Sequence, residues 1–350
     1  MKAALFLKPN DMALQTIADP VLESGDMLLR MTAAAICGTD IRVWRGRKIK
    51  GVRRPSILGH EFAGEIIDTG GHKGWSVGDQ VTVCPPLPCG TCRQCRLGAE
   101  NICANLVAFG YELEGGFAEL IRVPRAYVEA GHLFRIPEGL PPHLAALAEP
   151  LACVINGQDL LDLDGRGSIA VLGTGPIGLL HVMLARQRGA SRVIAVQRSA
   201  HRRAAALDLG ADEAMTPEEA EGLAVDACIV AAGSADLANL ATRITRPRGS
   251  ISLFAGFPVG EPTPFDLNAV HYGEHRVMGA FGLTRIQFAE ALDMIAGGTL
   301  PVAKLVSHRL PFSHVIEAFE QAEQGAALKV VVEPTSSSSS SRSSACARNP

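Results

Sequence analysis

Four cysteines in one short stretch give the strongest chemical signal in the sequence. They are separated by two, two and seven residues: Cys89, Cys92, Cys95 and Cys103. Four thiolates in one loop suit a tetrahedral Zn²⁺ ion and leave it no open position for a substrate. Cysteines of a hydrophobic core would not show such regular spacing among polar residues. We therefore expect a structural zinc ion that stiffens this loop and takes no part in chemistry.

A second set of metal-ligating residue types is dispersed along the chain. Its members are Cys37 in the run CGTD, His60 and Glu61 in the run GHEFAG, and Glu149 in the run AEP. Spacing alone does not join them. A buried cysteine, a hydrogen-bonded histidine and two surface carboxylates explain each residue separately just as well.

A glycine-rich run lies between a predicted strand and a predicted helix, which is the context of a dinucleotide-binding turn. Its key residues are Gly173, Gly175, Pro176, Ile177 and Gly178. The glycines permit a tight turn and close approach of the backbone to a pyrophosphate, which binds at the N-terminus of the following helix. An ordinary glycine turn would have the same pattern, but here the strand, the helix and a second strand all follow in order.

The residues after the second strand, Arg192 to Val196, bear on the choice between NAD and NADP. An acidic residue usually receives the ribose hydroxyls of NAD here, whereas this chain has Gln197, followed by Arg198 and Ser199. A missing carboxylate and an added guanidinium favour a 2′-phosphate. We therefore favour NADP and include Arg202 among the candidate cofactor residues, although a solvated first helical turn also explains its charge.

Two domains are needed to position these residues. The chain has 350 residues, of which 47% are hydrophobic. A chain of this length is usually too long to fold around one hydrophobic core. Up to about residue 150, short apolar runs between glycines and prolines predict strands and turns, as at Met27 to Met31 and Phe62 to Asp68. From residue 167, apolar runs alternate with helical stretches, which predicts parallel βαβ units. Later candidates are strands at Val225 to Ala231 and Ser250 to Ala255, and helices at Ala235 to Ile244 and Ile286 to Ala296.

Composition also limits the classes of partner that we expect the protein to bind. A net charge of −3 gives no general attraction to nucleic acid or to an acidic membrane. No apolar stretch suggests a signal peptide or a membrane span, so we expect a cytoplasmic protein with a small-molecule substrate. The serine-rich segment 335–350 has almost nothing to bury, and we expect a disordered tail there.

Four motifs occur in the order found in one known family: GHEFAG, the four-cysteine loop, GGFAE at 115–119, and TGPIGLL. From Met1 to about Glu333 the chain resembles the zinc-dependent medium-chain dehydrogenases. It looks most like their polyol branch, which includes sorbitol, xylitol, threonine and galactitol-phosphate dehydrogenases. The resemblance implies a GroES-like, mostly β catalytic domain at 1–152, a Rossmann domain with a doubly wound parallel sheet at 153–285, and a return to the catalytic domain at 286–334.

The resemblance also implies chemistry. Cys37, His60 and Glu149 would bind a catalytic zinc, with Glu61 as an alternating ligand, so two zinc ions per chain are expected. The glutamate at 149, where other branches have cysteine, points to the polyol group. Hydride would pass between NAD(P) and a secondary alcohol or its ketone, with Thr39 bonded to the substrate oxygen. By analogy with the family, the protein would be a homodimer or a homotetramer.

One position departs from the family pattern. A histidine that carries the proton to solvent is common three residues after the threonine, where this chain has Arg42. Arginine stays charged and cannot accept a proton. Either the proton leaves through the cofactor ribose and water, or Arg42 has another role.

A basic run surrounds Arg42 without one acidic residue: Arg42, Arg45, Arg47, Lys48, Lys50, Arg53 and Arg54. One or two of these cations would suit a substrate phosphate or carboxylate, although a solvated loop is an equally simple explanation. Trp44 would line the substrate pocket or cover the loop.

Three functions are compatible with these patterns. The first is a polyol or sugar-alcohol dehydrogenase, with a free or phosphorylated substrate. The second is a threonine-type amino-alcohol dehydrogenase, which the missing histidine weakens. The third is a nucleotide-binding protein without catalysis, which the complete ligand set argues against.

Overall fold

The computed structural model describes residues 1–48, 51–161, 163, 167–258, 260 and 262–334. The expected tail at 335–350 and Lys50 lie outside the described residues. The chain divides into two compact units. The first contains residues 1–149, 284–296 and the chain from 306 onward, and the second contains residues 150–283 and 297–305.

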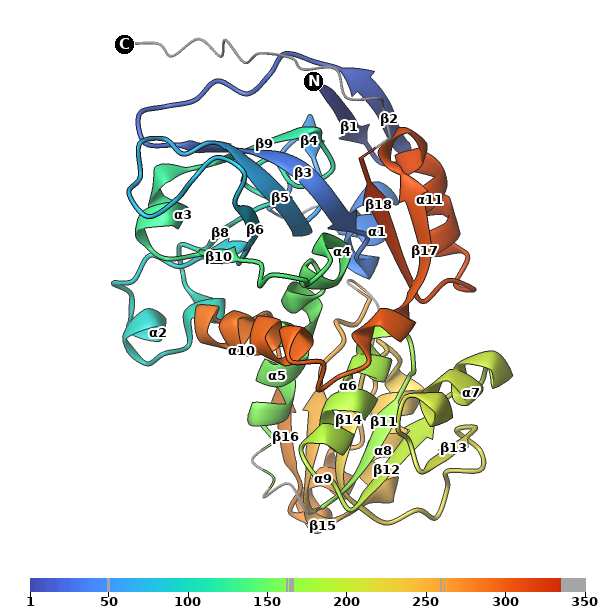
Figure 1. The fold of residues 1–350 in the computed structure, drawn as a ribbon. Helices are drawn as coiled ribbons and strands as arrows, with labels where there is room; N and C mark the ends of the chain where they lie inside the picture. Colours follow the sequence, from blue (N-terminus) through green and yellow to red (C-terminus); the bar gives the residue numbers. More distant parts are fainter. Residues whose placement is uncertain (49–50, 162, 164–166, 259, 261, 335–350) are drawn as a thin grey trace. The chain divides into compact units, whose positions relative to one another are not determined.

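The first unit is mainly β-structure (Figure 1). Its strands are β1 (Lys2–Lys8), β2 (Asp11–Thr16), β3 (Met27–Ala35), β4 (Ser56–Ile57), β5 (Glu61–Asp68), β6 (Gln80–Val83), β7 (Pro86–Leu87), β8 (Val107–Ala108), β9 (Leu120–Val123), β10 (Leu133–Arg135), β17 (Val306–Pro311) and β18 (Lys329–Glu333). One sheet has the order β2-β1-β4, and a larger sheet has the order β10-β6-β5-β3-β18-β17, with β9 paired to β3. β18 pairs antiparallel with β3 through Val331 and Ala35. The strands β17 and β18 therefore join the sheet that contains β3, β5 and β6.

The helices of the first unit are short. They are α1 (Gly38–Trp44), α2 (Arg93–Arg96), α3 (Arg125–Glu129), α4 (Pro142–Ala145), α10 (Arg285–Ala296) and α11 (Val315–Glu323). Large aromatic side chains fill the core between the sheets and α11, with Phe62, Phe117 and Phe319 almost fully buried. This packing fixes the end of β3, which Cys37 follows, and the start of β5, where His60 and Glu61 lie.

The second unit is a parallel sheet in the order β13-β12-β11-β14-β15-β16. Its strands are β11 (Ser168–Leu172), β12 (Arg192–Val196), β13 (Glu213–Met215), β14 (Val225–Val230), β15 (Thr245–Leu253) and β16 (Arg276–Gly279). Its helices are α5 (Ala148–Asp159), which begins in the first unit, and α6 (Pro176–Gln187), α7 (Ala200–Asp208), α8 (Ala235–Ile244) and α9 (Leu267–Gly273). All five residues of β11 are buried, as a strand covered on both faces requires. The predicted fold class is confirmed.

Most predicted elements differ from the observed ones by a few residues. β15 differs most, because it begins at Thr245 and not at Ser250. Thr245 pairs with Val225, and an irregularity follows before the regular ladder with β14 resumes at Ser250. The apolar pattern predicted only the regular part of the strand.

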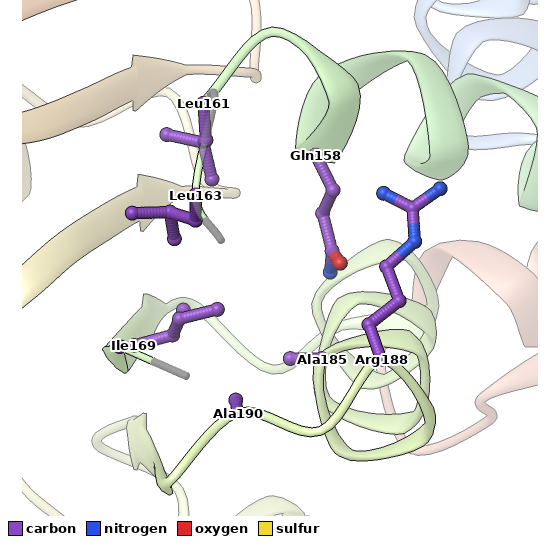
Figure 2. A pocket seen from close by; sticks show the side chains of 8 residues that line it. Gln158, Leu161, Leu163, Ile169, Ala185, Arg188 and Ala190 are labelled. Carbon is purple, nitrogen blue, oxygen red and sulfur yellow. The ribbon is translucent and has the colours of Figure 1, made fainter. Parts of the chain in front are cut away.

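A cavity of about 40 Å³ lies inside the second unit (Figure 2). Its walls are the apolar side chains of Leu161, Leu163, Ile169, Ala185 and Ala190, and the longer side chains of Gln158 and Arg188 flank it. This volume holds a few water molecules at most, so the cavity is too small for a nucleotide. No helix in the described part of the chain is long and apolar enough to cross a membrane.

The turn between β11 and α6 depends on a close backbone approach. Gly173 has a φ of 96°, a conformation that favours glycine. A Cβ atom added to Gly178 would lie 1.9 Å from the carbonyl oxygen of Gly173. The third glycine of the run is therefore required by packing, before any ligand is considered.

We predict that Gly178→Ala lowers the free energy of unfolding by about 1–3 kcal/mol, because the added methyl group displaces backbone atoms. Gly175→Ala is the control, because its Cβ would meet no atom within 4 Å. Urea unfolding without cofactor measures both. Equal stability of the two variants would show that the turn tolerates a side chain at either position.

Candidate active site and metal centres

The four cysteines of the loop form one cluster. The sulfur atoms of Cys89, Cys92, Cys95 and Cys103 all lie within 4.8 Å of one another. Backbone N–H groups point to them: Cys89 donates to the sulfur of Cys103 at 3.2 Å, and Asn105 donates to the same sulfur at 3.3 Å. Such donors stabilise thiolates.

The thiols of this cluster oppose one another's ionisation. Hydrogen bonds from Thr91 lower the pKa of Cys89 to about 5. Burial and the neighbouring thiols raise the pKa of Cys95 to about 12. Four thiolates therefore need a cation between them, and a tetrahedral set of thiolates suits Zn²⁺. The residues fit the structural zinc that the sequence predicts.

Cys37 is placed by the start of α1. It occupies the N-cap position, where its sulfur accepts a hydrogen bond from the backbone of Thr39 at 3.4 Å. The carboxylate of Asp40 bonds back to the Cys37 backbone at 3.0 Å, which completes a capping box. Both interactions fix the direction of the thiol.

His60 and Glu61 lie where the chain enters β5. Gly59 before them has a φ of 98°. A Cβ atom on Gly115 would lie 2.2 Å from the carbonyl oxygen of Gly59, and Gly116 donates to that oxygen at 2.9 Å. The backbones of the GHEFAG and GGFAE motifs thus contact each other directly. Only glycine permits so close an approach.

These elements bring three candidate ligands together. One ligand atom each from Cys37, His60 and Glu61 lies within 4.8 Å of the others. His60 is buried, and its Nδ1 has no hydrogen-bond partner, although Asp40 Oδ1 lies 3.4 Å away. Burial lowers the pKa of His60, but Asp40, Tyr111 and Cys37 together raise it well above the usual value. The surroundings therefore attract a cation. A thiolate, an imidazole and a carboxylate together form a set of ligands that fits zinc.

The fourth expected ligand is not part of this group of three. Glu149 lies in the first turn of α5 and is 9% exposed. Its charge raises the pKa values of both Tyr111 and Lys329, so it faces the same interior.

Lys329 is a functional neighbour that the sequence analysis missed. Its ammonium group donates to Glu61 Oε1 at 2.6 Å, and both side chains are buried. Burial lowers the pKa of Lys329, but the charges of Glu61, Cys37 and Glu149 outweigh it and raise that pKa. A lysine at the start of the apolar strand KVVVE was the available signal.

Thr39 and Arg42 lie on the exposed side of Cys37. Arg42 Nη2 donates to Thr39 Oγ1 at 3.1 Å. The threonine hydroxyl is therefore an acceptor toward Arg42, and its own hydrogen is left for another oxygen. Trp44, in contrast, is 5% exposed and packs in the core with its ring 5.7 Å from that of Phe319. We do not include it in the proposed site.

The cations of the basic run have different surroundings. Arg45 bonds to Glu323 at 2.9 Å and to Asn10 at 3.0 Å. Arg53 donates to a backbone carbonyl at 3.3 Å, and Arg54 lies 5.8 Å above the ring of Phe6. Lys48 donates to the hydroxyl of Tyr111 at 3.1 Å. Tyr111 in turn lies beside His60, with 5.7 Å between ring centroids.

The candidate cofactor residues lie in the second unit. Gly175 is the N-cap of α6 with Pro176 and Ile177 in its first turn, so the following backbone N–H groups are free to bind an anion. A groove of about 850 Å³ is lined by Arg198, which comes shortly after β12, and by Glu218, Ser234 and Arg243, among others. Neither Gln197 nor the glycine turn lines it. Gln197 directly follows β12, and Arg203, not Arg202, donates to its carbonyl at 2.8 Å. Ser199 precedes α7 and bonds to His201. The carbonyl of Arg202 accepts from Thr174 at 3.3 Å.

Removal of the buried partner of Glu61 tests this electrostatic arrangement. We predict that Lys329→Met lowers the free energy of unfolding of the metal-free protein by about 3–5 kcal/mol, because it leaves a buried carboxylate without a counter-charge. Adding Glu61→Gln to that variant should recover part of the loss. A double-mutant cycle by urea unfolding measures the coupling, and strictly additive effects would disprove the pairing.

Comparisons with known proteins find a family match in each of the two units. Residues 23–137 match the alcohol dehydrogenase GroES-like domain, and residues 176–297 match the zinc-binding dehydrogenase family. A D-altritol 5-dehydrogenase from Agrobacterium fabrum is 34% identical over 91% of this chain and 95% of its own length. An L-threonine 3-dehydrogenase from Bacillus licheniformis is 28% identical over 95% of this chain and 98% of its own.

A solved structure extends the likeness to three dimensions. It is described as a zinc-binding dehydrogenase from Sinorhizobium meliloti 1021 with NADP bound, and it superposes with a TM-score of 0.87. It is 31% identical and covers 95% of this chain and 99% of its own. The chain belongs to the zinc-dependent medium-chain alcohol dehydrogenases and is an NAD(P)-dependent oxidoreductase of alcohols.

Proposed function

We propose that this dehydrogenase oxidises a secondary alcohol of a polyol, or reduces the matching ketone, at a zinc ion held by Cys37, His60 and Glu149, with Glu61 as an alternating ligand. The group of Cys37, His60 and Glu61 carries the proposal, because three ligand atoms of the right types converge in a buried and negatively charged interior. The altritol dehydrogenase among the relatives supports a polyol substrate.

The chain's own residues prepare the substrate oxygen. When bound, zinc supplies a Lewis acid that lowers the pKa of an alcohol, and the nicotinamide supplies the hydride acceptor. Thr39 would bond the same oxygen with the hydrogen that Arg42 leaves unused. Arg42 cannot accept the proton, so it orients the hydroxyl, and the proton leaves by a route that does not pass through position 42.

An amino alcohol is the second candidate substrate, because the relatives include an L-threonine 3-dehydrogenase. A catalytically inactive nucleotide-binding protein is disfavoured, because all four expected ligands are present in the sequence and three of them, Cys37, His60 and Glu61, converge. The four-thiol cluster requires reduced cysteines, which supports a cytoplasmic location. A homodimer or homotetramer is supported by the free edge of β16 and by the exposed Leu267 and Tyr272, and light scattering distinguishes either from a monomer.

The proposed division into two zinc sites predicts different effects of two cysteine substitutions. Cys37→Ser should reduce zinc from two ions per chain to one and abolish turnover, while NADP still binds to the second unit. Cys92→Ser is the matched control, which should also remove one zinc ion but act mainly by loosening its loop. Metal analysis, turnover and cofactor fluorescence measure the three effects. Full activity of Cys37→Ser would refute the catalytic site.

We propose NADP as the preferred cofactor. The neutral Gln197 and the guanidinium of Arg198 beside the groove support it. Glu218 lies in the same groove. Hydrogen bonds from its own backbone and from Thr216 lower its pKa, and the charge of Arg198 adds to this lowering. A 2′-phosphate would therefore compete with Glu218 for Arg198.

Gln197→Asp should weaken NADP relative to NAD by about ten-fold or more, because it places a carboxylate next to the 2′-phosphate. Gln197→Asn, which keeps the position neutral, should change the ratio little. Dissociation constants of NADP and NAD for each variant measure this ratio. An unchanged ratio in the aspartate variant would remove Gln197 and Arg198 from cofactor selection.

A further inference from the structure

Two cations of the basic run differ from the other described members in their surroundings. Arg45, Arg53 and Arg54 have protein partners away from the metal group. Arg47 is exposed, and its charge adds to the lowering of the pKa of Glu323 that the hydrogen bond from Arg45 mainly causes. Arg42 and Lys48 instead contact Thr39 and Tyr111, which border Cys37 and His60. If the basic run were only a solvated loop, contacts of this kind would not be expected for Arg42 and Lys48 alone among its described members.

Lys48 is a partly buried cation without an acidic partner. Its ammonium group lies 4.5 Å from the centre of the Tyr111 ring and bonds to the Tyr111 hydroxyl at 3.1 Å. Within the part of the chain that the structure describes, no carboxylate lies within ion-pair distance of it. Burial lowers the pKa of Lys48 and the charge of Arg42 lowers it further, while the charges of Cys37, Asp40 and Glu112 offset part of this effect. The direct partner of the ammonium group is the Tyr111 hydroxyl and not a carboxylate.

The backbone holds the two cations together. The turn after α1 folds back on itself, and the N–H groups of Arg47 and Lys48 both donate to the carbonyl of Arg42, at 2.7 and 3.2 Å. Two like charges side by side are unfavourable unless an anion joins them. Such an anion would lie next to the Thr39 hydroxyl, where the substrate oxygen is expected.

We propose that Arg42 and Lys48 form a subsite for an oxyanion of the substrate, either a carboxylate or a phosphate. The substrate is then an anionic hydroxy compound whose reacting alcohol lies at Thr39, and this inference rests on the proposed function. Tyr111 positions Lys48, and Arg42 both orients Thr39 and binds the anion. A planar guanidinium beside an ammonium suits the several oxygens of either group.

Direct binding tests the subsite without turnover. Isothermal titration calorimetry of the zinc-loaded protein with inorganic phosphate and with acetate should detect binding of at least one. Lys48→Met and Arg42→Gln should each weaken it about ten-fold or more, the loss expected when one charged hydrogen-bond donor is removed. Arg47→Gln is the matched control from the same run and should bind like the parent protein. No binding by the parent, or equal weakening by Arg47→Gln, would overturn the subsite.

Kinetics then identify the source of the oxyanion. Neutral polyols are compared with their terminal phosphates and with matching hydroxy acids, including the 2-amino-3-hydroxy acids. We expect one anionic series to have the higher kcat/KM, and Lys48→Met to raise KM for that series about ten-fold or more relative to neutral polyols. Preference for neutral polyols would overturn this inference but leave the proposed function intact. No measurable turnover with any of these alcohols would contradict the proposed function. The calorimetry would still decide whether the anion site exists.

Discussion

Concentrated negative charge inside the first unit is the constraint on which the site depends. Asp40, Glu61 and Glu149 are each at most 9% exposed. Asp40 and Glu61 lie beside His60 and Cys37, and the charge of Glu149 acts on Lys329. Lys329 balances part of this charge through Glu61. A buried excess of negative charge is costly unless a cation enters. This buried charge supports the proposed zinc site, and it favours a cation there through burial as well as through the types of ligand.

The fold holds this charge in place through backbone contacts and not through long side chains. A capping box fixes Cys37 and Asp40 at the start of α1. The glycine contact between Gly59 and Gly115 fixes the approach to His60. β18, which carries Lys329, comes from the far end of the chain and pairs with β3. Segments distant in sequence thus meet at one site, and a change at any of them alters the electrostatics of the others.

Features that depend on local pattern could be predicted from the sequence. The four-cysteine loop, the glycine turn before α6 and the buried parallel strands each have a spacing that one local structure explains. The resemblance joined Cys37 to His60, because spacing could not. Lys329, Tyr111 and the difference between Lys48 and its basic neighbours were missed, since each depends on a contact between distant segments. Trp44 shows the same limit, because its position in the core depends on Phe319.

The proposed mechanism requires a zinc ion at Cys37 and His60 for hydride transfer. The most direct measurement is the absorbance of reduced nicotinamide when the purified protein meets NADP or NAD and a panel of neutral and anionic polyols, before and after a zinc chelator. The account predicts cofactor reduction that the chelator abolishes and added zinc restores, together with two zinc ions per chain in the active protein. Reduction that persists after the Cys37 site has lost its metal would contradict it.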